Sequence, residues 1–208
     1  MLKLGIVMDP IESIKPHKDS SFAMLLEAQK RGWEIYYMQQ HNLYMDNATS
    51  YADTQILEVK DAPDYFTLHQ QVTLRLDQLD VILMRKDPPF DLEYIYTTYL
   101  LEQAEQNGTL VVNKPQSLRD CNEKLFTYQF PQCCAPFRVS RNPDHLTRFL
   151  EQHGDIIIKP LDGMGGDSIF RIRSGDTNTN AIIETVSKHG QQQTMVQKYI
   201  PEISAGDK

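Results

Sequence analysis

A lysine and three glycines lie close together in the C-terminal part of the chain and could bind a phosphate. Residues 155–159 form an apolar run that ends in Lys159, and three glycines follow it, at Gly163, Gly165 and Gly166. Glycine allows positive φ angles, so successive backbone N–H groups can turn toward one point and surround an anion. A lysine beside them adds a mobile positive charge. The pattern favours a nucleotide triphosphate site, and the tip of an ordinary β-hairpin is the alternative.

The spacing of this segment differs from that of the common phosphate loops. No Gly-Lys-Ser/Thr sequence closes the turn, as it would in a P-loop, and the glycines do not follow the GxGxxG pattern of dinucleotide folds. Residues 168–172 alternate in polarity, which predicts that the loop leads into a strand rather than a helix. A helix N-terminus is therefore not available to the phosphates, and side-chain cations must neutralise them.

Two lysines and one strand end could complete such a site. Lys159 follows three isoleucines and would be partly desolvated, and a bound anion would supply a reason for its position. Lys124 is the second candidate cation, although taken alone it resembles a solvated surface lysine. Residues 197–201 join a strand to a loop that begins with a proline. This segment could offer backbone groups to an adenine edge, or it could be a strand end with a partly buried tyrosine.

The N-terminal part of the chain predicts a βαβ unit. A buried strand at residues 1–8 is followed by a helix at 20–31, which Asp19 can cap and Gly32 can end, and by a second strand at 33–38. The crossover between parallel strands should be right-handed. This part of the chain is therefore Rossmann-like in outline.

Another strand, at residues 79–84, ends in a charged loop that begins with Arg85. Ligands bind at the carboxyl ends of the strands in open α/β sheets, so this loop is a candidate substrate site. Pro88 and Pro89 in the same loop suggest a rigid turn that is compatible with a cis proline.

The sequence also predicts the other helices and strands, some segments more clearly than others. Residues 42–78 are the least informative, with a strand at a sheet edge at 54–59 and a loop or short helix at 65–76. Helices are expected at 92–106, where Asp91 is the cap, and at about 115–128, with a strand at 109–112 between them and a domain boundary in or near the second helix. The second portion is α+β, with strands at 137–139, 156–159 and 194–198 and helices at 143–152 and 180–188. Tyr96, Tyr99 and Leu100 could cover the sheet or pack between subunits.

Composition argues for small-molecule or protein partners. The 208 residues carry 21 Lys and Arg against 28 Asp and Glu, which disfavours nonspecific nucleic-acid binding and a basic membrane-surface helix. The apolar start of the chain is interrupted by Asp9 and Pro10, and no stretch approaches the roughly 20 apolar residues of a membrane span. Three cysteines without CxxC spacing fit a reducing compartment. A cytoplasmic location is therefore expected.

Five longer segments closely resemble bacterial glutathione synthetases, which are ATP-grasp ligases. These segments are residues 3–10, 19–24, 84–91, 113–125 and 159–170, and the resemblance extends from Met1 to Lys208. It implies an α/β fold with two parts. The first is a Rossmann-like pre-ATP-grasp domain at residues 1–122, with a mostly parallel sheet that binds substrate. The second is the first α+β subdomain of an ATP-grasp domain, at residues 123–208.

The resemblance also implies a reaction and its site. ATP would phosphorylate the cysteinyl carboxylate of γ-glutamylcysteine, and glycine would attack the acyl phosphate to give glutathione. Lys159 and Ser168 would be the catalytic residues, and Asp19, Ser20 and Arg85 would face the peptide, although Arg85 could equally pair with Asp87 or Asp91. The implied ATP-binding residues are Lys124, Lys159, Gly163, Met164, Gly165, Gly166, Asp167, Ser168, Gln197, Lys198, Tyr199 and Ile200.

Two features depart from the family pattern. Asp167 places a carboxylate inside the glycine loop, where it should repel a triphosphate. The resemblance implies that the second half of the ATP-grasp domain and the ligands of Mg²⁺ lie beyond Lys208. No acidic cluster in the 208 residues has metal-ligand spacing that could replace them. The 208 residues alone are therefore expected to make little or no glutathione, and the complete enzyme is expected to be a homo-oligomer. A noncatalytic nucleotide- or peptide-binding form and another ATP-grasp carboxylate–amine ligase are the alternatives.

Overall fold

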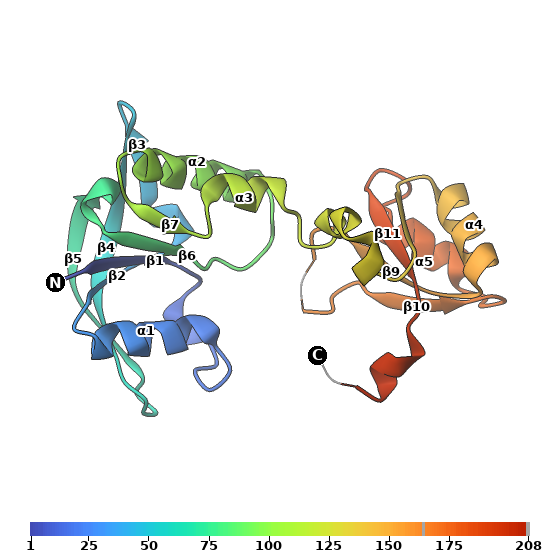
Figure 1. Ribbon diagram of the computed structural model, residues 1–208, viewed down its shortest axis with the longest axis horizontal. Coiled ribbons are helices and arrows are strands. Elements are labelled where there is room, and N and C mark those ends of the chain that lie inside the picture. Colours follow the sequence, from blue (N-terminus) through green and yellow to red (C-terminus); the bar gives the residue numbers. More distant parts are fainter. Residues whose placement is uncertain (164, 207–208) are drawn as a thin grey trace. The chain divides into compact units, whose positions relative to one another are not determined.

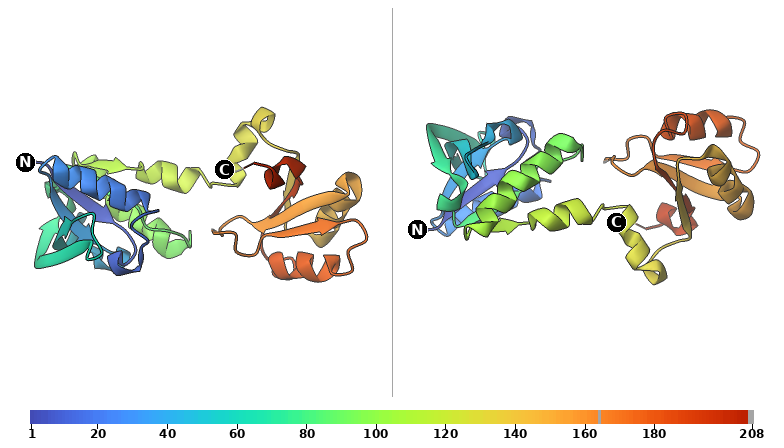
Figure 2. Two further views of the ribbon diagram at one scale, coloured as in Figure 1. Left: turned by 90° about the horizontal axis from the view of Figure 1, so that it is seen from below. Right: turned by 90° about the horizontal axis from the view of Figure 1, so that it is seen from above.

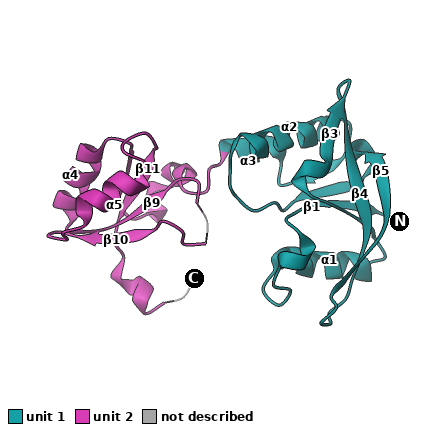
Figure 3. Cartoon of the chain, turned by 180° about the vertical axis from the view of Figure 1, so that it is seen from behind, with its two compact units in different colours: residues 1–120 teal, residues 121–208 magenta. Residues whose placement is uncertain are grey.

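The chain folds into two compact units, each with its own sheet and hydrophobic core. The computed structural model describes residues 1–163 and 165–206. The units are Met1–Asp120 and Cys121–Lys208 (Figure 3). Their elements are labelled in Figure 1.

The predicted βαβ unit forms the centre of the first sheet. Strand β1 (Lys3–Val7) pairs in parallel with β2 (Glu34–Met38), and helix α1 (Ser20–Lys30) connects them. On its other edge β1 pairs in parallel with β6 (Val81–Met84), which pairs with β7 (Leu110–Val112). Helix α2 (Leu92–Gln106) connects these last two strands.

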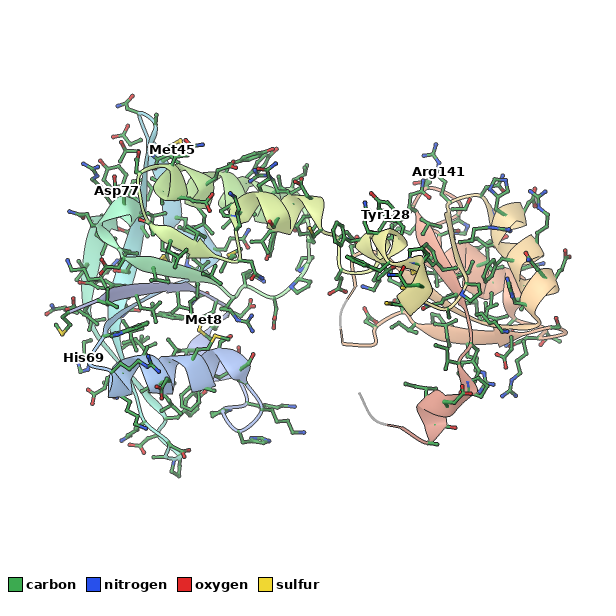
Figure 4. All side chains as sticks on the ribbon, in the orientation of Figure 1. Met8, Met45, His69, Asp77, Tyr128 and Arg141 are labelled. Atoms are coloured by element: carbon green, nitrogen blue, oxygen red, sulfur yellow. The ribbon has the colours of Figure 1, made fainter. Side chains whose placement is uncertain are left out.

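Side chains alternate between the two faces of this sheet because successive residues of a strand point in opposite directions. Leu4 and Ile6 of β1 belong to the core beneath α1, and Met8 joins them (Figure 4). Val7 belongs to the core beneath α2. Gly5 faces the same side, where a Cβ atom would lie only 2.7 Å from the Leu79 side chain. The two helices therefore cover opposite faces, and both faces of β1 are buried.

An antiparallel extension was not predicted correctly from the sequence. Strand β4 (Thr49–Val59) pairs with β2, β3 (Leu43–Asp46) and β5 (Phe66–Arg75), always antiparallel, on the side of the sheet away from β7 (Figure 2). The strand expected at 54–59 is confirmed as part of β4, but its expected edge position was wrong because β4 has partners on both sides. The expectation of a loop or short helix at 65–76 was also wrong, because β5 occupies these residues. Most side chains of β5 are exposed, so its apolar pattern is weak, and its strand structure depends on backbone pairing with β4.

Helix α2 confirms its predicted bounds and the Asp91 cap, which accepts the N–H of Tyr94. Its buried face is lined by Tyr94, Thr97, Thr98, Leu101 and Ala104. Leu100 packs against the core of the sheet, as expected, whereas Tyr96 and Tyr99 are 53% and 51% exposed and do not cover it. Among the described residues no helix is long and apolar enough to cross a membrane. The Pro88–Pro89 bond is cis.

Helix α3 (Pro115–Asp120) is shorter than the predicted helix at 115–128. Two 3₁₀ turns, η4 (Leu125–Gln129) and η5 (Pro131–Cys133), occupy the following residues. The side chain of Asn122 accepts the backbone N–H groups of Lys124 and Leu125, which gives the chain a local alternative to a continued helix.

The second unit is a four-stranded antiparallel sheet in the order β10-β9-β11-β8. Its strands are β8 (Phe137–Ser140), β9 (Asp155–Pro160), β10 (Phe170–Arg173) and β11 (Thr194–Lys198). Helices α4 (Pro143–His153) and α5 (Thr179–Val186) share one core with the sheet. Ile156 and Ile158 of β9 lie in that core, so the alternate residues of β9, Lys159 included, point to the opposite face.

Candidate nucleotide-phosphate site

Lys159 lies at the end of β9 with its ammonium group on the face away from α4 and α5. Its Nζ donates to Oε1 of Gln197 on β11 at 3.1 Å, and its side chain is half-buried. Burial, and next the charge of Lys124, lower the pKa of Lys159 below its ordinary value of 10.5. Within the described ranges, 1–163 and 165–206, no carboxylate forms an ion pair with it. Lys159 is therefore a desolvated cation whose charge is poorly compensated.

Lys124 comes to the same place from a distant part of the sequence. Its Nζ donates to the carbonyl oxygen of Gly163 and, at 3.4 Å, to that of Leu161, and it also pairs with Glu123. The side chain is only 12% exposed. The sequence-based alternative of an ordinary solvated lysine was therefore wrong, and the structure brings Lys124 to the glycine loop.

The glycine loop joins β9 to β10, so the site is built on a hairpin connection. The φ angles of Gly165, Gly166 and Ser168 are +68°, +82° and +56°, which are the left-handed values that turn backbone N–H groups out of the strand direction. At the base of the loop, Asp162 accepts two hydrogen bonds from Nε2 of Gln192, at 3.0 and 3.1 Å. Asp167 and Ser168 are exposed, and Met164 lies outside the described residues.

Within the predicted adenine segment, Gln197 contacts Lys159, whereas the residues after it lie near the opposite end of β9. Strand β11 ends at Lys198, and the N–H of Tyr199 donates to the carbonyl of Asp155 at 3.0 Å. The guanidinium of Arg171 lies 3.5 Å from the centre of the Tyr199 ring and forms two hydrogen bonds with Asp155, at 2.9 and 2.6 Å. Arg171 holds the pKa of Asp155 below its usual value. Ile200 is 50% exposed. Sequence inspection missed Arg171, whose position two residues before Arg173 gave no signal for this stack.

The candidate substrate residues of the first unit are linked to one another. Nε and Nη2 of Arg85 donate to the hydroxyl groups of Ser21 and Ser20, each at 2.9 Å. Asp19 caps α1, accepting the N–H of Phe22 at 2.8 Å. Among the described contacts Arg85 pairs with neither Asp87 nor Asp91, so that alternative was wrong. Ser21 was not predicted, although the Ser-Ser pair in the first helical turn was a usable signal.

Beside this group, Lys86 forms an ion pair with Asp9 at 2.9 Å. A cavity of about 420 Å³ opens next to the pair, lined also by Gln39, His41 and Tyr96. These residues follow or flank the carboxyl ends of β1, β2 and β6, which is the expected place for a ligand in an open α/β sheet. In the part of the chain that the structure describes, no group of three or more His, Cys, Asp or Glu residues could hold a metal ion.

Both units match known sequence families. Residues 2–119 match the family described as prokaryotic glutathione synthetase, N-terminal domain, and residues 123–208 match prokaryotic glutathione synthetase, ATP-grasp domain. The chain is 56% identical over its whole length to the glutathione synthetase of Vibrio vulnificus (strain YJ016) and 60% identical to that of Pseudomonas syringae pv. tomato. It spans 66% and 65% of the lengths of these two relatives.

Solved structures of two synthetases share the fold. A D-cycloserine synthetase aligns with 97% of this chain and 60% of its own, at a TM-score of 0.62 and 14% identity. D-alanyl-alanine synthetase A from Vibrio cholerae aligns with 96% of this chain and 61% of its own, at a TM-score of 0.57 and 12% identity. Together with the matches of both units, these similarities show that the chain belongs to the prokaryotic glutathione synthetase family and has the ATP-grasp ligase fold.

Proposed function

We propose that this chain carries the peptide- and nucleotide-binding parts of an ATP-dependent ligase that joins γ-glutamylcysteine and glycine. The observation that carries the proposal is the convergence of Lys124, Lys159 and the glycine loop on one face of the second unit. Two ammonium groups beside a loop with left-handed backbone provide charge and N–H donors for a triphosphate. Membership of the glutathione synthetase family supports the choice of substrates.

The proposed chemistry needs positioning and charge neutralisation. A carboxylate is a poor electrophile, and transfer of the γ-phosphoryl group converts the cysteinyl carboxylate into an acyl phosphate that the amine of glycine can attack. Phosphoryl transfer is catalysed largely by groups that hold the phosphates and balance their charge. Lys159 suits this role because its ammonium group is partly desolvated, which strengthens its interaction with an anion.

Lys124 and Ser168 have different proposed roles. Lys124 would bind phosphate oxygens from its position beside the carbonyl oxygens of Gly163 and Leu161. Ser168, exposed at the end of the loop, would donate its hydroxyl to a phosphate, while residues 197–200 would contact the adenine. ATP and Mg²⁺ are the proposed cofactors, but the described residues offer no carboxylate cluster that fits Mg²⁺, and no step here depends on it.

The first unit would bind the peptide. We propose that residues 1–122 form the substrate-binding domain and residues 123–208 the first part of the ATP-grasp domain. The guanidinium of Arg85 could turn from Ser20 and Ser21 to a substrate carboxylate, for which its planar geometry is suited.

The test measures ADP release with Mg²⁺-ATP, γ-glutamylcysteine and glycine, first with the 208-residue chain and then with the protein extended to the length of its relatives. We expect ATP binding by both forms and turnover, dependent on both substrates, by the longer form. A panel of other carboxylates and amines separates this activity from that of another ATP-grasp ligase. ADP release with another pair, and none with γ-glutamylcysteine and glycine, would contradict the proposal.

A further inference from the structure

We propose that Asn122 is a positioning residue that fixes the Lys124 ammonium group against the glycine loop. The inference rests on the proposed nucleotide-binding function and adds a residue that the proposed site does not contain. Asn122 itself is not expected to touch the nucleotide.

The side chain of Asn122 connects two segments that are far apart in the sequence. Its Oδ1 accepts the backbone N–H groups of Lys124 at 3.0 Å and Leu125 at 2.8 Å. Its Nδ2 donates to the carbonyl oxygen of Leu161 at 3.2 Å. The acceptor half of the amide therefore holds the backbone that carries Lys124, and the donor half holds the start of the glycine loop.

Lys124 uses the same carbonyl group as Asn122. The Leu161 oxygen accepts a hydrogen bond from Nδ2 of Asn122 and another from Nζ of Lys124, and the next loop carbonyl that Nζ reaches is that of Gly163. The backbone of Lys124, through Asn122, and the ammonium group of its side chain are therefore both held by the carbonyl group of Leu161. A lysine side chain is flexible, so fixing both ends lowers the entropy that ligand binding must otherwise remove.

Only a side chain with both a donor and an acceptor at this reach can make the connection. Asparagine carries one carbonyl oxygen and two N–H donors, whereas aspartate lacks the donor and serine, although a good local cap, has a shorter side chain. Asn122 could act merely as a cap of η4, and this alternative requires the acceptor bonds alone. The bond to Leu161 separates the two roles.

The first experiment measures amide hydrogen exchange in the nucleotide-free 208-residue chain and in Asn122→Ala, Asn122→Ser and Asn142→Ala. Asn142 is the matched control because its side chain caps α4 by accepting the N–H of Asp144 at 2.9 Å. We expect Asn122→Ala to speed exchange both at 124–126 and at 161–166, and Asn122→Ser to speed exchange at 161–166 alone. Faster exchange confined to 124–126 in both variants would show a cap and overturn the inference.

The second experiment measures binding of ATP and adenosine to the same chains by calorimetry. Loss of the anchor should weaken ATP binding by about tenfold in Asn122→Ala and Asn122→Ser, the size expected for one or two hydrogen bonds. Adenosine binding should not change, because adenosine carries no phosphate for Lys124. Asn142→Ala should bind both ligands as the unaltered chain does.

The outcomes distinguish this inference from the proposed function. Full ATP affinity in Asn122→Ser would mean that the cap suffices and would overturn the positioning role. Equal weakening of ATP and adenosine would indicate general damage to the unit and would also overturn it. Absence of ATP binding by the unaltered chain would contradict the proposed function, and the exchange data would then still decide whether Asn122 couples the two segments.

Discussion

Arg85 and Lys86 of the first unit differ from Lys159 of the second unit in the partners of their cationic groups. In the first unit the guanidinium of Arg85 is shared between two serine hydroxyls, and Lys86 has a carboxylate partner in Asp9. In the second unit Lys159 has one neutral partner, Gln197. Burial lowers the pKa of Lys159, and the nearby charge of Lys124 lowers it further.

This difference distinguishes cations that stabilise the fold from cations that are positioned to bind a ligand. A cation with matched partners stabilises the fold and must give up contacts before it can bind a substrate. A half-buried cation without a carboxylate partner carries a desolvation cost that an arriving phosphate removes. We therefore expect substitutions in the two units to move stability and binding in different directions.

Replacing Lys159 should produce the largest effect on binding. Lys159→Met retains a similar volume and removes the ammonium group, so ATP affinity should fall at least about 100-fold, equivalent to about 2.8 kcal/mol. The free energy of unfolding at neutral pH should stay equal or rise, because the desolvated charge is lost. Calorimetry and urea denaturation measure the two quantities. A clear loss of stability would show that the contacts of Lys159 stabilise the fold, as those of Arg85 are expected to do.

Replacing Arg85 should lower the free energy of unfolding, in contrast to replacing Lys159. Arg85→Ala leaves the Ser20 and Ser21 hydroxyls without their donor, and Ser21 is only 5% exposed, so we expect a loss of about 1–2 kcal/mol. Affinity for γ-glutamylcysteine should fall by about tenfold, the cost of one charge-assisted contact. Arg31→Ala is the control, because Arg31 forms an exposed ion pair with Glu27 and should change stability by less than about 0.5 kcal/mol. Unchanged peptide affinity in Arg85→Ala would remove Arg85 from the proposed site.

The pH dependence of ATP binding should report Lys159 with a smaller change. Since the pKa of Lys159 is lowered from 10.5, the ammonium loses its proton at a lower pH than an ordinary lysine does, and ATP affinity should fall as pH rises through that value. Stability should move the other way, because between the lowered pKa and 10.5 the unfolded chain binds more protons than the folded chain. From pH 7 upward, titration calorimetry tests the expected fall in ATP affinity, and urea denaturation tests the expected rise in stability. Lys159→Arg, which keeps its charge, should lose this pH dependence.

The same comparison explains what the sequence could predict. Lys159 was identifiable because three isoleucines precede it, and the β1-α1-β2 unit because Asp19 and Gly32 mark the ends of its helix. The strand at β5 could not be predicted from its apolar pattern, because backbone pairing with β4 holds it. The end of α3 depends on Asn122, whose distant partner, Leu161, is close only in the folded chain. The alternative that Arg85 pairs with acidic residues near in sequence was wrong, because its partners come from α1.

Asp167 should give the smallest effect and test the charge argument within one loop. Its exposed carboxylate accepts no hydrogen bond from the residues that the structure describes and should repel a triphosphate, so Asp167→Ala should leave ATP affinity unchanged or raise it by a few-fold. Asp162 lies five positions earlier and anchors the loop to Gln192, so Asp162→Ala should weaken ATP binding although it removes the same charge. Calorimetry at low and high salt separates the two effects. Salt screening diminishes the gain in ATP affinity that comes from removing the repulsion, but it does not restore the affinity lost with the Asp162–Gln192 hydrogen bonds. Weaker ATP binding by Asp167→Ala would mean that the carboxylate has a partner in the bound state. Asp167 would then be a charge held by its own contacts, as Arg85 is.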